Sequence, residues 1–154
     1  MSQEEATARN EVAMKCFNEG FRCSQSVLEA WAKDFGLDPL LGRKISAPLA
    51  GGSAVGGECG AVSGAFLVIG MRYTPDRVED LEGFMKMMAR VREFADSFKA
   101  RHGSLNCSEL LGLDVLSEQG HGEFKEKNMK ETHCVRYVED AMNLLEEAMG
   151  GERR

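Results

Sequence analysis

This sequence is short of positive charge and of long apolar runs. Its 154 residues include 19 lysines and arginines against 25 acidic residues, a formal net charge of -6. Phosphate binding requires clustered Lys and Arg, so this balance disfavours general nucleic-acid binding. The longest apolar run, from Ala65 to Met71, is far too short to span a bilayer. We therefore expect no nucleic-acid partner and no membrane insertion.

The start of the chain lacks a targeting segment. It reads MSQEEATARNEVAM, which is polar and acidic, unlike a secretory signal or a transit peptide. On this basis we expect a cytoplasmic protein. A reducing compartment disfavours permanent disulfides, so the five cysteines are typical either of metal binding and redox chemistry or of small buried apolar residues.

Several local motifs are also missing. There is no CxxC pair, the signature of a zinc knuckle or a thioredoxin-like site, and no CxxCH for covalent haem. The chain has no GxxxxGK[ST], and no strand leads into its glycines as a dinucleotide site requires. A hydrolase is disfavoured because there is no nucleophile elbow. Any site shared by the cysteines must therefore be assembled by tertiary folding.

Helical periodicity, in contrast, runs along most of the chain. Apolar residues recur at helical spacing over 4–19, 24–35 and 59–72. Thr74 and Pro75 are expected to open the longest helix, which reaches about Ala100 and carries an apolar stripe that includes Val78, Leu81, Phe84, Met85 and Met88. No segment alternates convincingly as a strand, so the periodicity predicts an all-α protein.

The remaining segments complete a helical chain. Asp38 and Pro39 are typical of a cap and a first helical residue, a short helix is expected near Asn106, and Thr132 is expected to cap the last helix. The polar stretch 117–130, with two glycines, is expected to be a surface excursion. No repeat or linker divides the chain. We therefore predict one all-α domain over residues 1–154, with a core of about 10–150, built as a bundle of five to seven helices.

The segment GGSAVGGECGAVSGAFLVIG, residues 51–70, places glycines both before and inside a predicted helix. Gly60 and Gly64 each weaken a helix interior by about 0.5–1 kcal/mol relative to alanine. Because they lie four apart on one face, we expect a neighbouring helix or a cofactor to approach the backbone there. Gly56 and Gly57 would let the preceding loop adopt positive φ and turn its N–H groups inward. All four glycines are candidate cofactor-binding residues.

Four of the five cysteines lie at or within the first turn of a predicted helix: Cys23, Cys59, Cys107 and Cys134. Helix N-termini carry unpaired N–H groups and partial positive charge, which stabilise a thiolate over a thiol. The thiolate is both the nucleophile and the metal ligand. Cys16 instead lies in mid-helix on an apolar face, so we expect a structural role for it.

The residues also resemble a known family. The segments GFRCSQSVLEAW, GGECGAVSGAFLVIG, HGSLNCSELLGLD and HCVRYVEDAMNLLEEAM are similar in order and spacing to the redox-active proteins named for the pattern C_GCAxxG_C_C. The resemblance implies that Cys23, Cys59, Cys107 and Cys134 are the signature cysteines, and it leaves Cys16 outside the pattern. Glu58 stands where the family name suggests glycine, and it adds a negative charge beside Cys59.

The resemblance implies redox or metal chemistry at one site, without naming a substrate or a redox partner. Some relatives carry the module beside cytochrome-like parts, which favours electron transfer through an iron–sulfur cluster held by the four cysteines. Thiol/disulfide exchange between pairs of them is the other form of this hypothesis. A structural four-cysteine zinc site and a non-catalytic helical binding module remain alternatives, and a homodimer is open.

Overall fold

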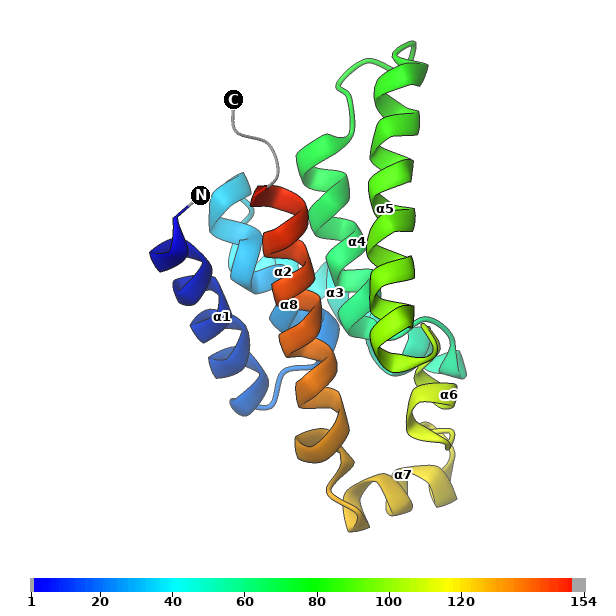
Figure 1. The fold of residues 1–154 in the computed structure, drawn as a ribbon. Coiled ribbons are helices and arrows are strands. Elements are labelled where there is room, and N and C mark those ends of the chain that lie inside the picture. The colour runs from blue at the N-terminus through cyan, green and yellow to red at the C-terminus, as the bar shows by residue number, and fades with distance from the viewer. Residues whose placement is uncertain (1, 151–154) are drawn as a thin grey trace.

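The computed structural model describes residues 2–150, and most of these lie in eight α-helices (Figure 1). No strand occurs between residues 2 and 150; one isolated antiparallel bridge joins Glu58 and Asn106. The all-α prediction is confirmed, but the described part of the chain has eight helices rather than five to seven. The helices are α1 (Gln3–Asn18), α2 (Cys23–Ala32), α3 (Pro39–Ser46), α4 (Gly60–Tyr73), α5 (Leu81–His102), α6 (Cys107–Leu111), α7 (Glu118–Glu126) and α8 (Val135–Gly150).

Capping side chains explain where several helices begin. The Ser2 hydroxyl accepts the Glu5 N–H (3.2 Å), and the Glu5 carboxylate accepts the Ser2 N–H (2.7 Å), which closes a capping box before α1. The Asp38 carboxylate accepts the Leu41 N–H (2.9 Å) before α3. These side chains satisfy backbone donors that the first turn of a helix leaves without partners.

Helix α7 is the element that the sequence did not predict. The Ser117 hydroxyl caps it by accepting the Gly120 N–H (2.9 Å). A Cβ at Gly120 would collide with the Asp114 carbonyl, so this glycine allows the first turn of α7 to pack against the preceding loop. Most of the segment 117–130 is exposed, as expected of a surface excursion, but it forms a helix that the prediction did not include.

The predicted start of the longest helix was also wrong. Helix α4 ends at Tyr73, and α5 begins only at Leu81, where the Asp80 carboxylate accepts the Gly83 N–H (2.8 Å). The α4–α5 hairpin projects beyond the rest of the bundle, so none of the other described elements covers its tip (Figure 1). Val78, Leu81, Phe84, Met85 and Met88 are accordingly exposed, and the buried part of the α5 stripe is Met87, Phe94 and Phe98.

Helix α2 lies at the centre of the packing. It contacts α1, α3, α4 and α8, and α8 in turn contacts α1, α4 and α5. Trp31, Phe17 and Phe98 are the largest fully buried side chains. Among residues 2–150, no helix is both long enough and apolar enough to cross a membrane. The arrangement brings the first turns of α2 and α4 together, and this contact positions the candidate site.

Candidate functional site

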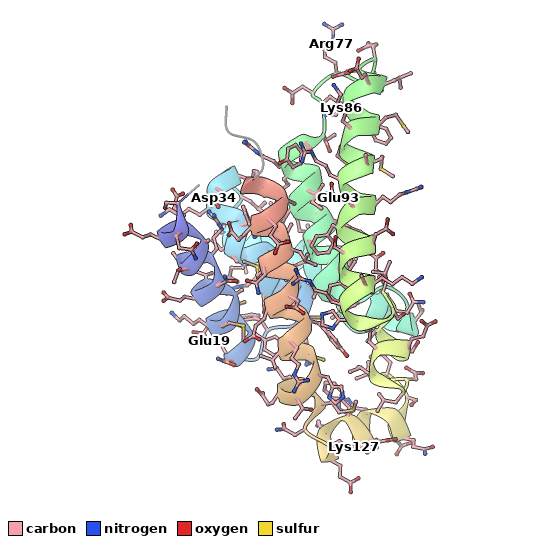
Figure 2. The ribbon with its side chains drawn as sticks, viewed as in Figure 1. Glu19, Asp34, Arg77, Lys86, Glu93 and Lys127 are labelled. Atoms are coloured by element: carbon pink, nitrogen blue, oxygen red, sulfur yellow. The ribbon has the colours of Figure 1, made fainter. Side chains whose placement is uncertain are left out.

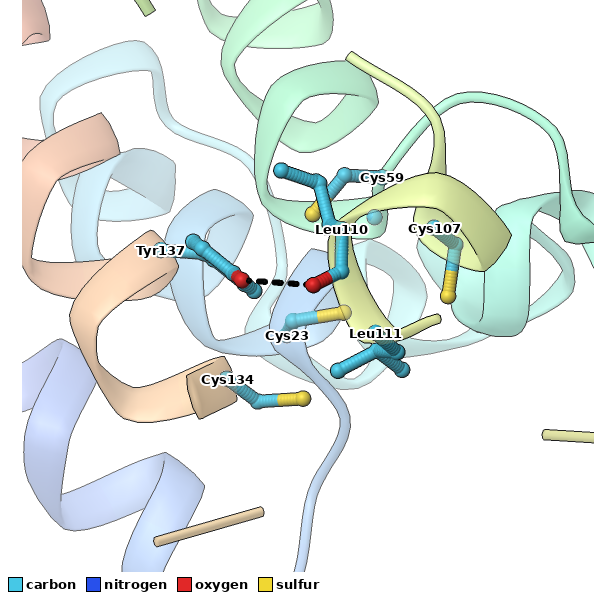
Figure 3. A pocket seen from close by; sticks show the side chains of 8 residues that line it. Cys23, Cys59, Cys107, Leu110, Leu111, Cys134 and Tyr137 are labelled. Carbon is cyan, nitrogen blue, oxygen red and sulfur yellow. Dashed lines mark hydrogen bonds between the residues drawn. The ribbon is translucent and has the colours of Figure 1, made fainter. Parts of the chain in front are cut away.

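The four cysteines at helix starts line one cavity of about 20 Å³ (Figure 3). Cys23 and Cys107 are the first residues of α2 and α6, and Cys59 directly precedes α4. Cys134 ends a π-helical turn, Lys130–Cys134, that leads into α8. The rest of the wall consists of Gly60, Leu110, Leu111 and Tyr137. The fold thus brings together thiols from four separate segments in an otherwise apolar enclosure.

The start of α8 differs from the prediction. Thr132 does not cap the helix; it lies inside the π-helical turn, where its hydroxyl donates to the Asn128 carbonyl (3.1 Å). Helix α8 begins at Val135, one residue after Cys134. The wider π-helical turn, not an N-cap, therefore precedes α8 where Cys134 meets the cavity.

Two backbone hydrogen bonds fix Cys59 beside Cys107. The Cys59 N–H donates to the Leu105 carbonyl (2.7 Å), and the Cys107 N–H donates to the Gly57 carbonyl (2.7 Å). The Ser108 hydroxyl adds a bond to the Gly56 carbonyl (2.9 Å). Gly56 and Gly57 therefore hold the Cys107 segment through their carbonyl groups, and neither residue lines the cysteine cavity.

Cys23 is the one cysteine of this cavity whose pKa is lowered. The first cause is a hydrogen bond from Cys59, and the N–H groups of Ser24 and Ala61 also donate to the Cys23 sulfur, against the opposing effect of burial. These two N–H groups come from the first turns of α2 and α4. The sulfur therefore lies where two helix N-termini converge, a setting that stabilises a thiolate.

The other three thiols have raised pKa values. The hydrogen bond to Cys23 and burial hold the pKa of Cys59 well above its usual value. Burial, followed by the negative charge of Cys23, raises the pKa of Cys107 to about 11 and that of Cys134 to about 12. A helix N-terminus thus fails to stabilise a thiolate at Cys59 and Cys107, because burial and the neighbouring sulfur outweigh it.

Glu58, which stands where the family pattern suggests glycine, has little influence on the pKa of the neighbouring Cys59. Burial raises the pKa of the Glu58 carboxyl. The high pKa of Cys59 comes from Cys23 and from burial rather than from its acidic neighbour. Glu58 also takes part in the bridge to Asn106, so it lies in the backbone pairing that holds the two cysteine segments together.

The cysteine pattern and this geometry agree with a comparison to known families. A family model described as "Putative redox-active protein (C_GCAxxG_C_C)" matches residues 21–148. The chain belongs to this family. No curated protein and no solved structure is significantly similar to it.

The C_GCAxxG_C_C motif has a steric explanation in this member of the family. A Cβ at Gly60 would lie 2.5 Å from the Cys23 sulfur, so the first glycine makes room for the thiol of another helix. A Cβ at Gly64 would lie 3.0 Å from the Ser24 carbonyl oxygen and 3.3 Å from the Val27 Cβ. The expected close approach is therefore that of α2 and its cysteine.

The four thiols do not form a ready metal site. Their donor set is right in kind for an iron–sulfur cluster or for zinc. However, no three Cys, His, Asp or Glu side chains in the described residues are arranged to hold a metal ion. The cavity of about 20 Å³ is close to the space that one water molecule needs. The sulfurs and Leu110 and Leu111 would have to move apart to admit a cluster.

A second, larger cavity of about 270 Å³ reaches Cys23, Cys107 and Cys134. Cys59 does not line this cavity and is only 5% exposed. Cys23 therefore faces both cavities, whereas its hydrogen-bond partner Cys59 lies behind it. Cys23 is thus partly exposed, whereas Cys59 is buried.

Tyr137 is a site residue that sequence reasoning missed. Its hydroxyl donates to the Leu110 carbonyl (3.2 Å), and burial and the three sulfurs of Cys134, Cys59 and Cys107 raise its pKa (Figure 3). Tyr137 follows Cys134 by three residues, and such a pair shares a helix face. This spacing from Cys134 could have identified Tyr137 as a site residue from the sequence.

Cys16 lies apart from these residues. Its thiol is 2% exposed and donates to the Glu29 carboxylate (3.2 Å), and burial raises its pKa to about 12. Arg43 holds the same carboxylate from the other side, at 2.5 Å. Neither the 20 Å³ cavity nor the 270 Å³ cavity includes Cys16 in its lining.

Replacing Cys16 with serine is expected to lower the free energy of unfolding by about 1–2 kcal/mol, because a hydroxyl replaces an apolar sulfur in a buried position. The hydroxyl can still donate to Glu29, which limits the loss. Thiol exchange and any metal content should stay at the wild-type level. Urea unfolding and disulfide reduction of the same preparation measure the two effects, and loss of exchange would place Cys16 in the site.

Proposed function

We propose that this chain is a dithiol/disulfide redox protein in which Cys23 attacks and Cys59 resolves. The observation that carries the proposal is the asymmetry of this hydrogen-bonded pair. Cys23 has a lowered pKa and faces the larger cavity, while Cys59 has a raised pKa and is buried behind it. An attacking thiol needs thiolate character and access, and a resolving thiol needs proximity to the attacking sulfur.

The first step is attack by the Cys23 thiolate on one sulfur of a substrate disulfide. A mixed disulfide between Cys23 and the substrate forms, the substrate S–S bond breaks, and the departing thiolate takes up a proton from solvent. Attack removes the negative charge from Cys23. The leading cause of the high Cys59 pKa is the interaction with Cys23, so loss of that charge favours release of the Cys59 proton.

The second step is attack by Cys59 on the Cys23 sulfur. It forms the Cys23–Cys59 disulfide and releases the second substrate thiolate, which is protonated in turn. Two electrons pass from the cysteine pair to the substrate. The Ala61 N–H lowers the pKa of both cysteines, so it supports the thiolate at each step. A dithiol reductant returns the pair to the reduced state by the reverse exchange.

Mass spectrometry after oxidation tests this assignment. Reduced protein is treated with hydroxyethyl disulfide, quenched with acid and digested. We expect a Cys23–Cys59 disulfide in the wild type and a trapped mixed disulfide on Cys23 in the Cys59→Ser variant. The Cys16→Ser variant serves as the control and should form the wild-type disulfide. A disulfide that excludes Cys23 would contradict the proposal.

The same preparation tests the iron–sulfur alternative. Protein purified without oxygen is measured for visible absorbance, iron, sulfide, zinc and free thiols. We expect five free thiols per chain after reduction, the number of cysteines in the sequence, and no metal in stoichiometric amount. A brown protein with iron and sulfide, lost on serine substitution at any of the four clustered cysteines, would replace the dithiol proposal with a cluster.

A further inference from the structure

The cavity of about 270 Å³ has a composition that indicates a ligand. Its lining includes Cys23, Cys107 and Cys134, together with residues of α1, α6, α7, the π-helical turn before α8 and the loops between these elements. Most of the wall is apolar or aromatic, including Phe17, Phe21, Phe124, Leu111, Val115 and Leu116. Such a wall favours an apolar body, because contact with it removes apolar surface of the ligand from water.

The charged side chains that line this cavity are all basic. They are Arg22 and Lys130, and His121 adds an imidazole; of the described residues in the lining, none is acidic. Lys130 is held in place, because its Nζ donates to the Phe17 carbonyl (2.8 Å) and lies 4.6 Å from the centre of the Phe17 ring. The chain as a whole has a net charge of -6, but the basic side chains make this cavity attractive to an anion.

The volume limits the size of the ligand. An engineered cavity of about 150 Å³ holds benzene, so by proportion this cavity holds about ten non-hydrogen atoms. A compact carboxylate with a short apolar chain fits this size. A folded protein or a large peptide disulfide would leave most of its atoms outside the cavity.

We propose that this cavity binds a small apolar carboxylate that carries a disulfide, and that this is the substrate class of the chain. The proposal rests on the thiol exchange proposed above. The carboxylate lies toward Arg22 and Lys130, the chain lies along the aromatic side chains, and the disulfide reaches Cys23. Lipoate, a cyclic disulfide on a short chain that ends in a carboxylate, is the probe for this class.

The exchange with such a cyclic disulfide is balanced. Cys23 attacks one ring sulfur, the ring S–S bond opens, and the second sulfur leaves as a thiolate that takes up a proton. Cys59 then forms a disulfide with Cys23 and releases the first sulfur as the second thiol. The ligand gains two electrons and two protons; the cysteine pair loses the two electrons and the Cys59 proton, and solvent supplies the second proton.

Single-turnover reduction tests whether the negative charge of the ligand contributes to its binding. Reduced protein is mixed at low salt with lipoate or with its neutral amide, and the Cys23–Cys59 disulfide is followed by mass. We expect lipoate to react about tenfold faster at low concentration, because its carboxylate can accept charged hydrogen bonds in the cavity and its amide cannot. Arg22→Gln and Lys130→Gln should abolish the preference. Equal rates for lipoate and its amide in the wild type would overturn the proposed class.

The matched control is Arg77→Gln. Arg77 lies at the tip of the α4–α5 hairpin, at the opposite end of the molecule from Lys127 beside α7 (Figure 2). Its guanidinium is 3.6 Å from the Glu79 carboxylate and exposed to solvent. This variant removes the same charge and should keep the wild-type preference for lipoate. Loss of the preference in Arg77→Gln would assign it to net charge and contradict binding in the cavity.

Two further probes separate this inference from the proposed function. Hydroxyethyl disulfide is small and neutral, so its reduction should be equal in the wild type and Arg77→Gln; no reduction in either would contradict thiol exchange alone. Octanoate cannot react, so its binding, measured by calorimetry, tests the cavity alone. We expect binding to the wild type that weakens about tenfold in Arg22→Gln. No binding of octanoate to the wild type would overturn the inference even if exchange occurs.

Discussion

The Cys23→Ser variant is expected to lose the fast phase of thiol alkylation at pH 7 while it remains folded. The pKa of Cys23 lies below the ordinary thiol value of 9.0, whereas those of Cys107 and Cys134 lie at about 11 and about 12. At pH 7 an ordinary thiol is ionised to about one part in a hundred, and a thiol of pKa 11 to about one part in ten thousand. With equal access, the fast rate should therefore fall by more than about 100-fold.

Iodoacetamide labelling followed by peptide mass spectrometry measures this rate for each cysteine separately. Alkylation requires the thiolate, so the rate at Cys23 should reach its plateau at a lower pH than the rates at Cys107 and Cys134. Circular dichroism of the Cys23→Ser variant checks that the helices persist. Equal labelling rates at the clustered cysteines across pH 6–9 would show that Cys23 is not the activated thiol.

Two substitutions at Cys59 show where the activation arises. The hydrogen bond from Cys59 is the first cause of the lowered Cys23 pKa. Cys59→Ala removes the donor and should move the labelling profile of Cys23 to higher pH, toward an ordinary thiol. Cys59→Ser keeps a donor and should move it less. The difference between the two variants isolates the hydrogen bond from the change in cavity size that they share.

The positions of three of the four cysteines could be predicted because local signals set them. Asp38, Pro39 and the glycines near helix ends gave the helix order, and apolar spacing placed Cys23, Cys59 and Cys107 at helix starts, where the structure has them. The chemistry of the four thiols could not be predicted in the same way. It depends on which sulfur receives the N–H groups of both α2 and α4, and only the tertiary contact determines that.

The errors in the predicted fold also arise from tertiary contacts that the local sequence does not determine. No helix was predicted over 117–130, where Gly120 serves the contact with Asp114 that lets α7 form. The apolar stripe predicted for the longest helix included Val78, Leu81 and Met85, but these residues are exposed at a hairpin tip that no other described element covers (Figure 1). Local sequence patterns indicate which secondary structure a residue favours. Whether that residue is buried depends on which other parts of the chain pack against it.

The meeting of α2 and α4 explains why Gly64 is expected to be the most sensitive position of the helix interior. A Cβ there would lie 3.0 Å from the Ser24 carbonyl oxygen and 3.3 Å from the Ser24 Cα, both backbone atoms. Backbone cannot turn aside as a side-chain end can, so a larger residue must push the two helices apart. That movement would also separate the Cys23 sulfur from the Ala61 N–H that stabilises its thiolate.

Gly64→Leu is therefore expected to destabilise the protein by about 3 kcal/mol, the upper part of the range for overpacked cores. For a chain of this size that corresponds to a melting temperature about 6–12 °C lower. Gly70→Leu is the matched control, because Gly70 lies in the same helix and a Cβ there would meet only the Thr74 hydroxyl oxygen at 3.8 Å. Its better helix propensity should leave the melting temperature unchanged or raise it. Thermal unfolding followed by circular dichroism compares the two variants with the wild type. A Gly64→Leu protein that melts at or above the Gly70→Leu protein would show that α2 and α4 are not in close contact at this glycine.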